Sequence, residues 1–168
     1  MEPLRGVRVV ECATYIAAPS GGMTLARLGA DVIRVDPLGG AGDLRRWPLA
    51  PGGPSLYWTG LNKGKRSLTV DLRSPRGQEL VTELITQPGP GRGVLLDNTV
   101  GWHWLDHDRL AERRPDLVHV RVQGRRDGGP ALDYTVNAAA GIPLLTGAER
   151  SRGPVNHQLP AWDLLTGA

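Results

Sequence analysis

The sequence predicts an α/β fold, a Rossmann-like parallel sheet with flanking helices. Short β-branched apolar runs alternate with segments of helical spacing along most of the 168 residues. The runs are apolar at successive positions, which is typical of parallel strands buried on both faces. The 23 glycines and 14 prolines fall between these segments as turns and form no repeat.

The first elements form a β-α-β unit. Val7–Glu11 is a short β-branched strand, and the small residues of Thr14–Ser20 predict a loop after it. Apolar residues at helical spacing then predict a helix over Gly21–Leu28, closed by Gly29 as a C-terminal glycine. Ala30–Asp36 is the next strand. This order is typical of a right-handed parallel crossover.

Three further strands and three further helices complete the predicted fold. A Gly/Pro-rich excursion runs from Leu38 to about Gly60 before the alternation resumes. Strands are expected at Ser67–Leu72, Gly93–Asp97 and Leu117–Val122. Helices are expected after Ser74 as N-cap and Pro75 as first residue, through Leu110 to Arg114 with Asp106 or Asp108 as cap, and over Asp133–Ala140.

Loops beyond the carboxyl ends of the strands are the expected ligand-binding positions in such a sheet. Several contain glycine or other small residues, which let a ligand approach the backbone. These loops are Thr14–Ser20, Pro37–Arg46, Asn98–Gly101 and Gln123–Asp133.

Composition narrows the classes of partner. The net charge of +3 comes with arginine pairs separated by acids, and aromatic residues make up 5%, so a nucleic-acid interface is not indicated. No apolar run reaches the length of a membrane span, and Met1–Gly6 leads directly into a strand. The single Cys12 lies in an apolar run and fits a buried thiol in a reducing compartment. We therefore expect a cytoplasmic protein without membrane partners.

Motif tests leave two carboxylates as candidates for chemistry. Gly-x-Gly-x-x-Gly, a P-loop and the Gly-x-Ser-x-Gly elbow do not occur, and His103 and His107 have no third ligand nearby, so no metal site is expected. Asp133 and Asp163 each precede or enter a predicted helix. By residue type alone, helix capping is favoured for both, while attack on an activated acyl group is the alternative. His157 is near Asp163 in sequence, so it is a candidate for the same site. A role in shaping the loop is an equal alternative.

Several motifs together resemble the class III CoA-transferases, the CaiB/BaiF or formyl-CoA transferase type. The motifs stand in the family's order over essentially every residue. They are Leu4–Glu11, Leu28–Asp36, Gly42–Arg45 and Asn62–Ser67. Further stretches resemble the members that move CoA from one carboxyl of a C5 dicarboxylate to the other, a C1–C4 transfer on mesaconyl-CoA. These are Asp43–Pro51, Ser55–Trp58, Asp133–Asn137 and Pro154–Asp163.

The resemblance implies an enzyme in which Asp163, before Thr166-Gly167, is the nucleophile and temporary carrier of CoA. Racemases of the superfamily have histidine where this chain has Leu132, so transferase chemistry is implied and Asp133 becomes structural. Coenzyme A enters as an acyl-CoA substrate with a dicarboxylate, and no cofactor is bound permanently. The implied CoA contacts fall on Ile16, Ala17, Val70, Arg73, Asn98 and Thr99.

Two departures accompany the resemblance. Arg125 stands where many members have an aromatic residue, and Asn98-Thr99 replaces an asparagine-aromatic pair. Arg45 or Arg46 would hold a substrate carboxylate, with a solvated surface as the equal alternative.

Family members are more than twice as long as this chain. Residues 1–168 therefore correspond to the N-terminal part of the large domain, with the small domain absent and the family's homodimer out of reach for the fragment. Two alternatives stay open: an intermolecular acyl-CoA:carboxylate CoA-transferase, or a truncated CoA-binding remnant without activity.

Overall fold

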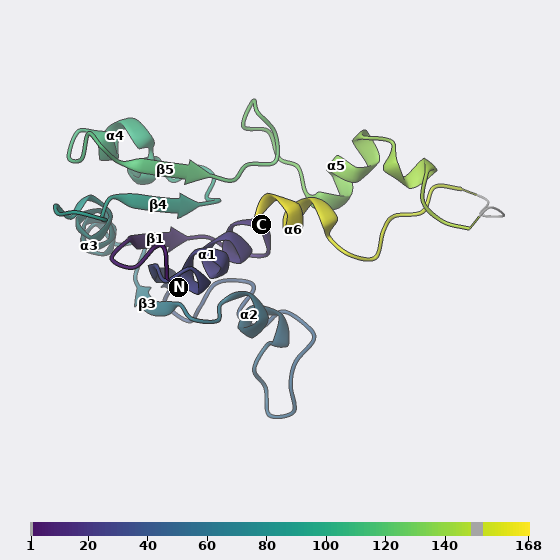
Figure 1. Cartoon of the computed structure of the whole chain (residues 1–168), viewed down its shortest axis with the longest axis horizontal. Helices are drawn as coiled ribbons and strands as arrows, with labels where there is room; N and C mark the ends of the chain where they lie inside the picture. Colours follow the sequence, from purple (N-terminus) through teal and green to yellow (C-terminus); the bar gives the residue numbers. More distant parts are fainter. Residues whose placement is uncertain (1, 149–152) are drawn as a thin grey trace.

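The computed structural model describes residues 2–148 and 153–168 and contains a five-stranded parallel sheet. The strand order is β3-β2-β1-β4-β5, and all neighbouring strands run in the same direction (Figure 1). The strands are β1 (Arg8–Cys12), β2 (Asp31–Pro37), β3 (Arg66–Val70), β4 (Val94–Asp97) and β5 (Val118–Arg121). The order reverses at β1, as in Rossmann-like folds, which confirms the predicted fold class.

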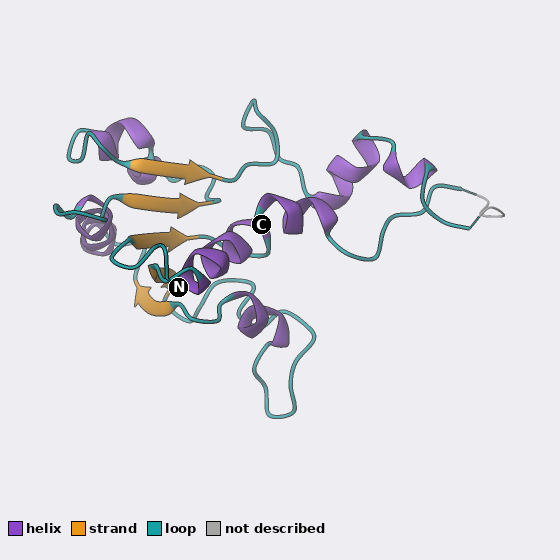
Figure 2. Cartoon of the chain, viewed as in Figure 1, coloured by secondary structure: helices purple, strands orange, loops and turns teal. Residues whose placement is uncertain are grey.

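Helices cover both faces of the sheet (Figure 2). They are α1 (Ala17–Arg27), α2 (Leu56–Leu61), α3 (Pro75–Thr86), α4 (His107–Ala111), α5 (Asp133–Ala139) and α6 (Ala161–Thr166), with 3₁₀ turns η1 (His103–Leu105) and η2 (Ile142–Leu144). Val10 packs with residues of α3 and α4, whereas its neighbour Val9 packs on the opposite face with Ala18 of α1. Successive residues of β1 therefore bury on opposite sides, which explains its apolar run, whereas the edge strands β3 and β5 keep exposed residues because they pair on one side only.

The predicted start of α1 was wrong by four residues, because the helix begins at Ala17 rather than at Gly21. Pro19 lies in the first turn, where a missing N–H costs no hydrogen bond. Gly22 lies inside the helix, and this position requires glycine because a Cβ there would come within 1.7 Å of Glu11 Oε2 on β1. The loop-like composition thus reflects close packing of the helix on the sheet. Gly29 follows α1 with a φ of +100°, as predicted for a C-terminal glycine.

The excursion between β2 and β3 contains a helix that the sequence did not predict. Ser55 caps α2 by accepting a hydrogen bond from the Trp58 N–H at 3.1 Å. The same Ser55 hydroxyl donates to the Arg46 carbonyl at 2.5 Å, so α2 is tied to the preceding loop. Leu49 forms an isolated antiparallel bridge with Ser55. The excursion is therefore folded back on itself.

The start of α3 confirms the predicted cap, whereas α4 differs. Ser74 accepts from the Gly77 N–H at 3.0 Å, with Pro75 as the first helical residue. Asp106 precedes α4, but its carboxylate makes no capping bond and instead lies 3.2 Å from His103 Nδ1. The helix also ends at Ala111 rather than Arg114.

The last two helices lie beyond the carboxyl ends of the strands (Figure 1). α5 begins at Asp133, as predicted, and α6 contains Asp163 as its third residue. α6 returns to pack against the start of α1, which follows β1. Among the described residues, no helix is long and apolar enough to cross a membrane.

Candidate active site

Asp163 is held in place by Asp133, the first residue of α5. The backbone N–H of Asp163 donates to Asp133 Oδ2 at 3.1 Å. The Asp133 side chain is buried, and its other oxygen, Oδ1, has no hydrogen-bond partner among the described residues. Asp133 therefore satisfies one of the free N–H groups at the start of α6, a structural role that fits the expectation drawn from Leu132.

Asn137 holds both the loop before α6 and the first turn of that helix. This fully buried residue of α5 donates from Nδ2 to Asn156 Oδ1 at 2.6 Å. Its Oδ1 accepts from Trp162 Nε1, the residue before Asp163, at 3.2 Å. The Asn137 side chain thus uses both ends of its amide to set the position of the nucleophile candidate, a role that its place in a motif did not disclose.

Gly167 brings α6 against α1. A Cβ at this position would lie 1.9 Å from Ser20 Oγ and 2.3 Å from the Ala17 carbonyl oxygen. Only glycine allows this approach, which accounts for the glycine of the Thr166-Gly167 pair. Gly167 follows Asp163 by one helical turn, and its N–H donates to the Asp163 carbonyl at 3.2 Å. The helix that carries Asp163 is consequently held against the start of α1.

The pKa of the Asp163 carboxyl is raised above its ordinary value. Partial burial is the larger cause, and the neighbouring negative charge of Asp133 is the second. Both disfavour the ionised form, so the carboxylate that does form is more basic than one in water. A more basic carboxylate is a stronger nucleophile toward an acyl carbon.

The predicted CoA-contact residues after β1 and β4 lie side by side. Asn98 accepts from the Thr14 N–H at 3.0 Å and donates to the Thr14 carbonyl at 2.8 Å, which joins the two loops. Thr99 donates from its backbone to Asp97 at 3.0 Å. Ile16 is the N-cap residue of α1 and Ala17 its first residue. Both ends of the Asn98 side-chain amide are hydrogen-bonded to the backbone of Thr14. A ligand at this place would therefore contact atoms other than this amide.

The other two predicted contact residues are separate from this pair of loops. Val70 is the buried last residue of β3, and Arg73 is exposed beyond it. β2 lies between β3 and β1 in the sheet, which puts about 10 Å between the two groups. A single ligand reaches both groups only if it is elongated along the carboxyl edge.

A stack of two tyrosines and an arginine stands at the same edge. The Arg46 guanidinium carbon lies 5.5 Å from the Tyr15 ring centroid and 4.8 Å from that of Tyr57. Burial raises the pKa of Tyr57 to about 12, the positive charge of Arg46 opposes that rise, and Asp163 contributes to it. The Tyr57 hydroxyl therefore interacts electrostatically with both the candidate nucleophile, Asp163, and Arg46. Neither tyrosine was identified from the sequence as a site residue.

Buried polar and charged side chains beneath this edge connect three of the sequence motifs, Leu28–Asp36, Gly42–Arg45 and Asn62–Ser67. Arg34 of β2 donates to Asp36, to Asp43 at 3.0 Å and to Asn62 Oδ1 at 3.0 Å. Asp43 also accepts from the Tyr15 N–H at 3.0 Å, and Tyr15 has a φ of +68°, an uncommon conformation for a bulky residue. Asp43 therefore connects β2 to the loop after β1.

The second half of this network centres on Lys65. Its Nζ donates to Glu11 at 2.8 Å, to the Pro19 carbonyl at 2.8 Å and to Asn62 at 2.9 Å. Burial raises the pKa of Glu11 to about 7 and lowers the pKa of Lys65, because it disfavours both charges more than their attraction favours them. The network fixes the start of α1 and the loop before β3.

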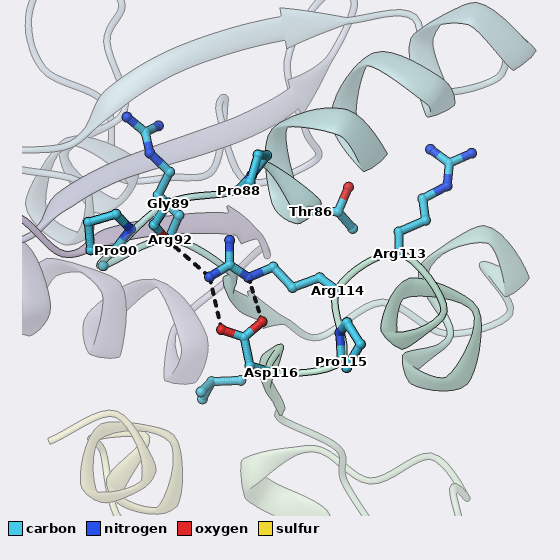
Figure 3. A pocket seen from close by; sticks show the side chains of 11 residues that line it. Thr86, Pro88, Gly89, Pro90, Arg92, Arg113, Arg114, Pro115 and Asp116 are labelled. Atoms are coloured by element: carbon cyan, nitrogen blue, oxygen red, sulfur yellow. Dashed lines mark hydrogen bonds and ion pairs between the residues drawn. The ribbon is translucent and has the colours of Figure 1, made fainter.

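A cavity of about 630 Å³ lies at the opposite end of the sheet (Figure 3). Its walls precede β4 and β5, so it is at the amino ends of the strands, away from Asp163. Arg114, its most central cation, already contacts Asp116 and the carbonyls of Gln87 and Gly89. Ligands of parallel α/β sheets bind at the carboxyl ends of the strands, and Arg114 is already paired within the protein. Both observations favour a candidate site elsewhere.

The histidines do not assemble a metal centre in the part of the chain that the structure describes. No group of three His, Cys, Asp or Glu side chains there is arranged to hold a metal ion. His107 packs against His119, which lies 2.5 Å from Asp97. His157 lies 3.1 Å from the Leu159 carbonyl and shapes the loop before α6.

Fold and site together define a class of protein: a Rossmann-like sheet with a partly buried aspartate at its carboxyl edge, beside loops open to an elongated ligand. The chain belongs to CoA-transferase family III, whose sequence profile matches residues 4–168. It is 54% identical over 165 residues to 2-methylfumaryl-CoA isomerase of Chloroflexus aurantiacus, covering 98% of this chain and 40% of that protein. It is 33% identical to succinate–glutarate CoA-transferase of Agrobacterium fabrum, covering 98% of this chain and 44% of that one.

A solved structure agrees with the fold. A CaiB/BaiF family protein from Brucella suis superposes with a TM-score of 0.85 at 32% identity, over 98% of this chain and 46% of that chain. The chain thus spans less than half the length of the relatives it matches. The resemblance drawn from the sequence motifs is confirmed.

Proposed function

We propose that this chain carries the nucleophile of an enzyme that moves CoA between carboxylates through an aspartyl-CoA thioester. The observation that carries the proposal is Asp163. α5 and Gly167 hold this aspartate at the carboxyl edge, and burial raises its pKa. Membership of CoA-transferase family III supplies the reaction class. Residues 1–168 are proposed to form the N-terminal part of the large domain.

In the first step, an Asp163 carboxylate oxygen attacks the thioester carbonyl of the acyl-CoA. A C–O bond forms and the C–S bond breaks, which gives a mixed anhydride and the CoA thiolate. The thiolate then attacks the Asp163 carbonyl carbon, so a C–S bond forms and the substrate carboxylate leaves. Asp163 now holds CoA as a thioester, and no proton or electron has been exchanged with solvent.

In the return steps, an acceptor carboxylate attacks the aspartyl thioester and releases the thiolate again. The thiolate attacks the acyl carbon of the new anhydride and regenerates the Asp163 carboxylate. Only a carboxylate can act as both nucleophile and temporary thioester carrier, since serine would form an ester that cannot accept CoA.

The proposed substrate is 2-methylfumaryl-CoA, with the acceptor carboxylate at the other end of the same molecule. The 54% identity to 2-methylfumaryl-CoA isomerase supports this choice. The alternative is intermolecular transfer to a separate carboxylic acid, supported by the similarity to succinate–glutarate CoA-transferase. A CoA-binding remnant without activity is the non-enzymatic alternative.

Incubation with 2-methylfumaryl-CoA labelled at one carboxyl tests the proposal. We expect CoA to move to the other carboxyl without entering a pool of added free dicarboxylate, and Asp163→Ala to abolish the movement. Transfer into added free acid would favour the intermolecular alternative. Equal behaviour of the protein and its Asp163→Ala variant would show that Asp163 does not carry CoA.

A further inference from the structure

The guanidinium of Arg46 contacts two aromatic rings, one of which, Tyr57, also interacts electrostatically with Asp163. The central carbon of this guanidinium lies over the rings of Tyr15 and Tyr57, and no carboxylate among residues 2–148 and 153–168 is within ion-pair distance of it. Arg34, by contrast, is surrounded by Asp36, Asp43 and Asn62. Arg46 therefore has its charge and its N–H fork free for an anion.

The position of Arg46 is set by its backbone and its aromatic neighbours. Its carbonyl accepts from Ser55 Oγ, and its N–H donates to the Asp43 carbonyl at 3.1 Å. Asp43 in turn holds the Tyr15 N–H, which places one of the two flanking rings. The backbone contacts fix where the side chain starts and the ring contacts restrict its rotamers, so it loses less conformational entropy when it binds a ligand.

The Tyr57 hydroxyl adds a second polar group to the same place. It is buried and lacks a hydrogen-bond partner in the described part of the chain. With a raised pKa, it remains protonated at neutral pH and keeps its donor hydrogen. A buried donor without a partner lowers the stability of the protein until a ligand accepts its hydrogen bond.

We propose that Arg46, which contacts the rings of Tyr15 and Tyr57, binds the distal carboxylate of a dicarboxylyl-CoA and so selects dicarboxylates over monocarboxylates. The proposal rests on the proposed function, because it takes Asp163 as the group facing the thioester end. Arg45 is excluded from this role, since no aromatic ring of the described residues stacks on it. Arg46 acts here as a specificity residue.

Binding of two matched ligands in an Asp163→Asn background tests the proposal without chemistry. 2-Methylfumaryl-CoA and (E)-2-methylbut-2-enoyl-CoA differ only in the distal group, a carboxylate in the first and a methyl in the second. We expect the dicarboxylyl ligand to bind more tightly, and Arg46→Gln to reduce that preference by about 10- to 100-fold, the range for a charge-assisted pair of hydrogen bonds. Arg45→Gln is the matched control and keeps the preference.

Tyr57→Phe removes the hydroxyl and leaves the ring, so it should reduce the preference less than Arg46→Gln does. Arg46→Lys keeps the charge without the planar fork and should restore part of the preference. Equal binding of both ligands to the parent, no binding of either, or equal weakening of both by Arg46→Gln would each overturn the proposal. Failure of the proposed function is separate, because it appears as missing CoA transfer in the protein with Asp163 intact.

Discussion

Gly167→Ala should disturb the site from outside it. The added Cβ would lie 2.3 Å from the Ala17 carbonyl oxygen, 0.7 Å less than the 3.0 Å below which real Cβ contacts essentially do not occur. The Ala17 carbonyl belongs to the backbone of α1 and cannot rotate away. α6 must therefore move by at least that amount, and Asp163, one turn earlier on the same short helix, moves with it.

Two magnitudes follow from this displacement. Overpacking of this kind costs about 1–3 kcal/mol of unfolding free energy. A shift of about 1 Å in a reacting group lowers the rate by up to about 100-fold. Urea unfolding measures the first, and the rate of CoA transfer at saturating 2-methylfumaryl-CoA measures the second.

The matched control is Gly60→Ala in α2, where an added Cβ has no atom within 4 Å. This variant should be neutral, or stabilised by up to about 1 kcal/mol through helix propensity. If Gly167→Ala unfolds at the same urea concentration as Gly60→Ala and turns over at the same rate, the docking of α6 on α1 does not position Asp163.

Three further predictions concern charge and capping. Asp133→Asn keeps an acceptor for the Asp163 N–H but removes the like charge, so the pKa of Asp163 falls and the pH–rate profile of CoA transfer moves to lower pH; an unmoved profile would contradict the assigned cause. Because the pKa of Glu11 is raised from 4.5 to about 7 on folding, the folded state binds more protons in this interval and Glu11 makes the unfolding free energy fall as pH rises through it. Glu11→Gln should flatten the curve between pH 5 and 7 in urea titrations, and an unchanged slope would refute the raised pKa. Ser74→Ala should cost about 1 kcal/mol by removing the cap of α3, whereas Ser74→Asp should retain most of the stability, and chemical denaturation of the pair decides.

The central strands were predictable because burial on both faces leaves a direct trace in the sequence. Val9 and Val10 face opposite cores, and both must be apolar. Ser74-Pro75 carries its own local capping chemistry, which needs no tertiary contact. The bounds of α1 and the existence of α2 were harder to predict. Gly22 is explained only by the contact of α1 with Glu11 on β1, and α2 is a short helix tied to a loop.

The candidate site likewise has a part that the sequence indicated and a part that only the structure revealed. Asp163 was a helix cap by residue type, and only the resemblance to a family made it a nucleophile. The tertiary contacts that place it come from Asp133, Asn137 and Gly167, which are distant in sequence from β1. The helical spacing of Asp133 and Asn137 on α5 does not indicate that both side chains contact α6. The stacking of Tyr15 and Tyr57 on Arg46 joins two loops, and no local pattern predicts such a meeting.

The most direct test of the account traps the thioester on Asp163 itself. The protein is incubated with 2-methylfumaryl-CoA, treated with hydroxylamine and digested, and the peptide around residue 163 is examined by mass spectrometry beside that around Asp133. We predict a hydroxamate on Asp163 alone, formed only when the acyl-CoA is present. A hydroxamate on Asp133, or none on either aspartate, would contradict the assignment of Asp163 as the carrier of CoA.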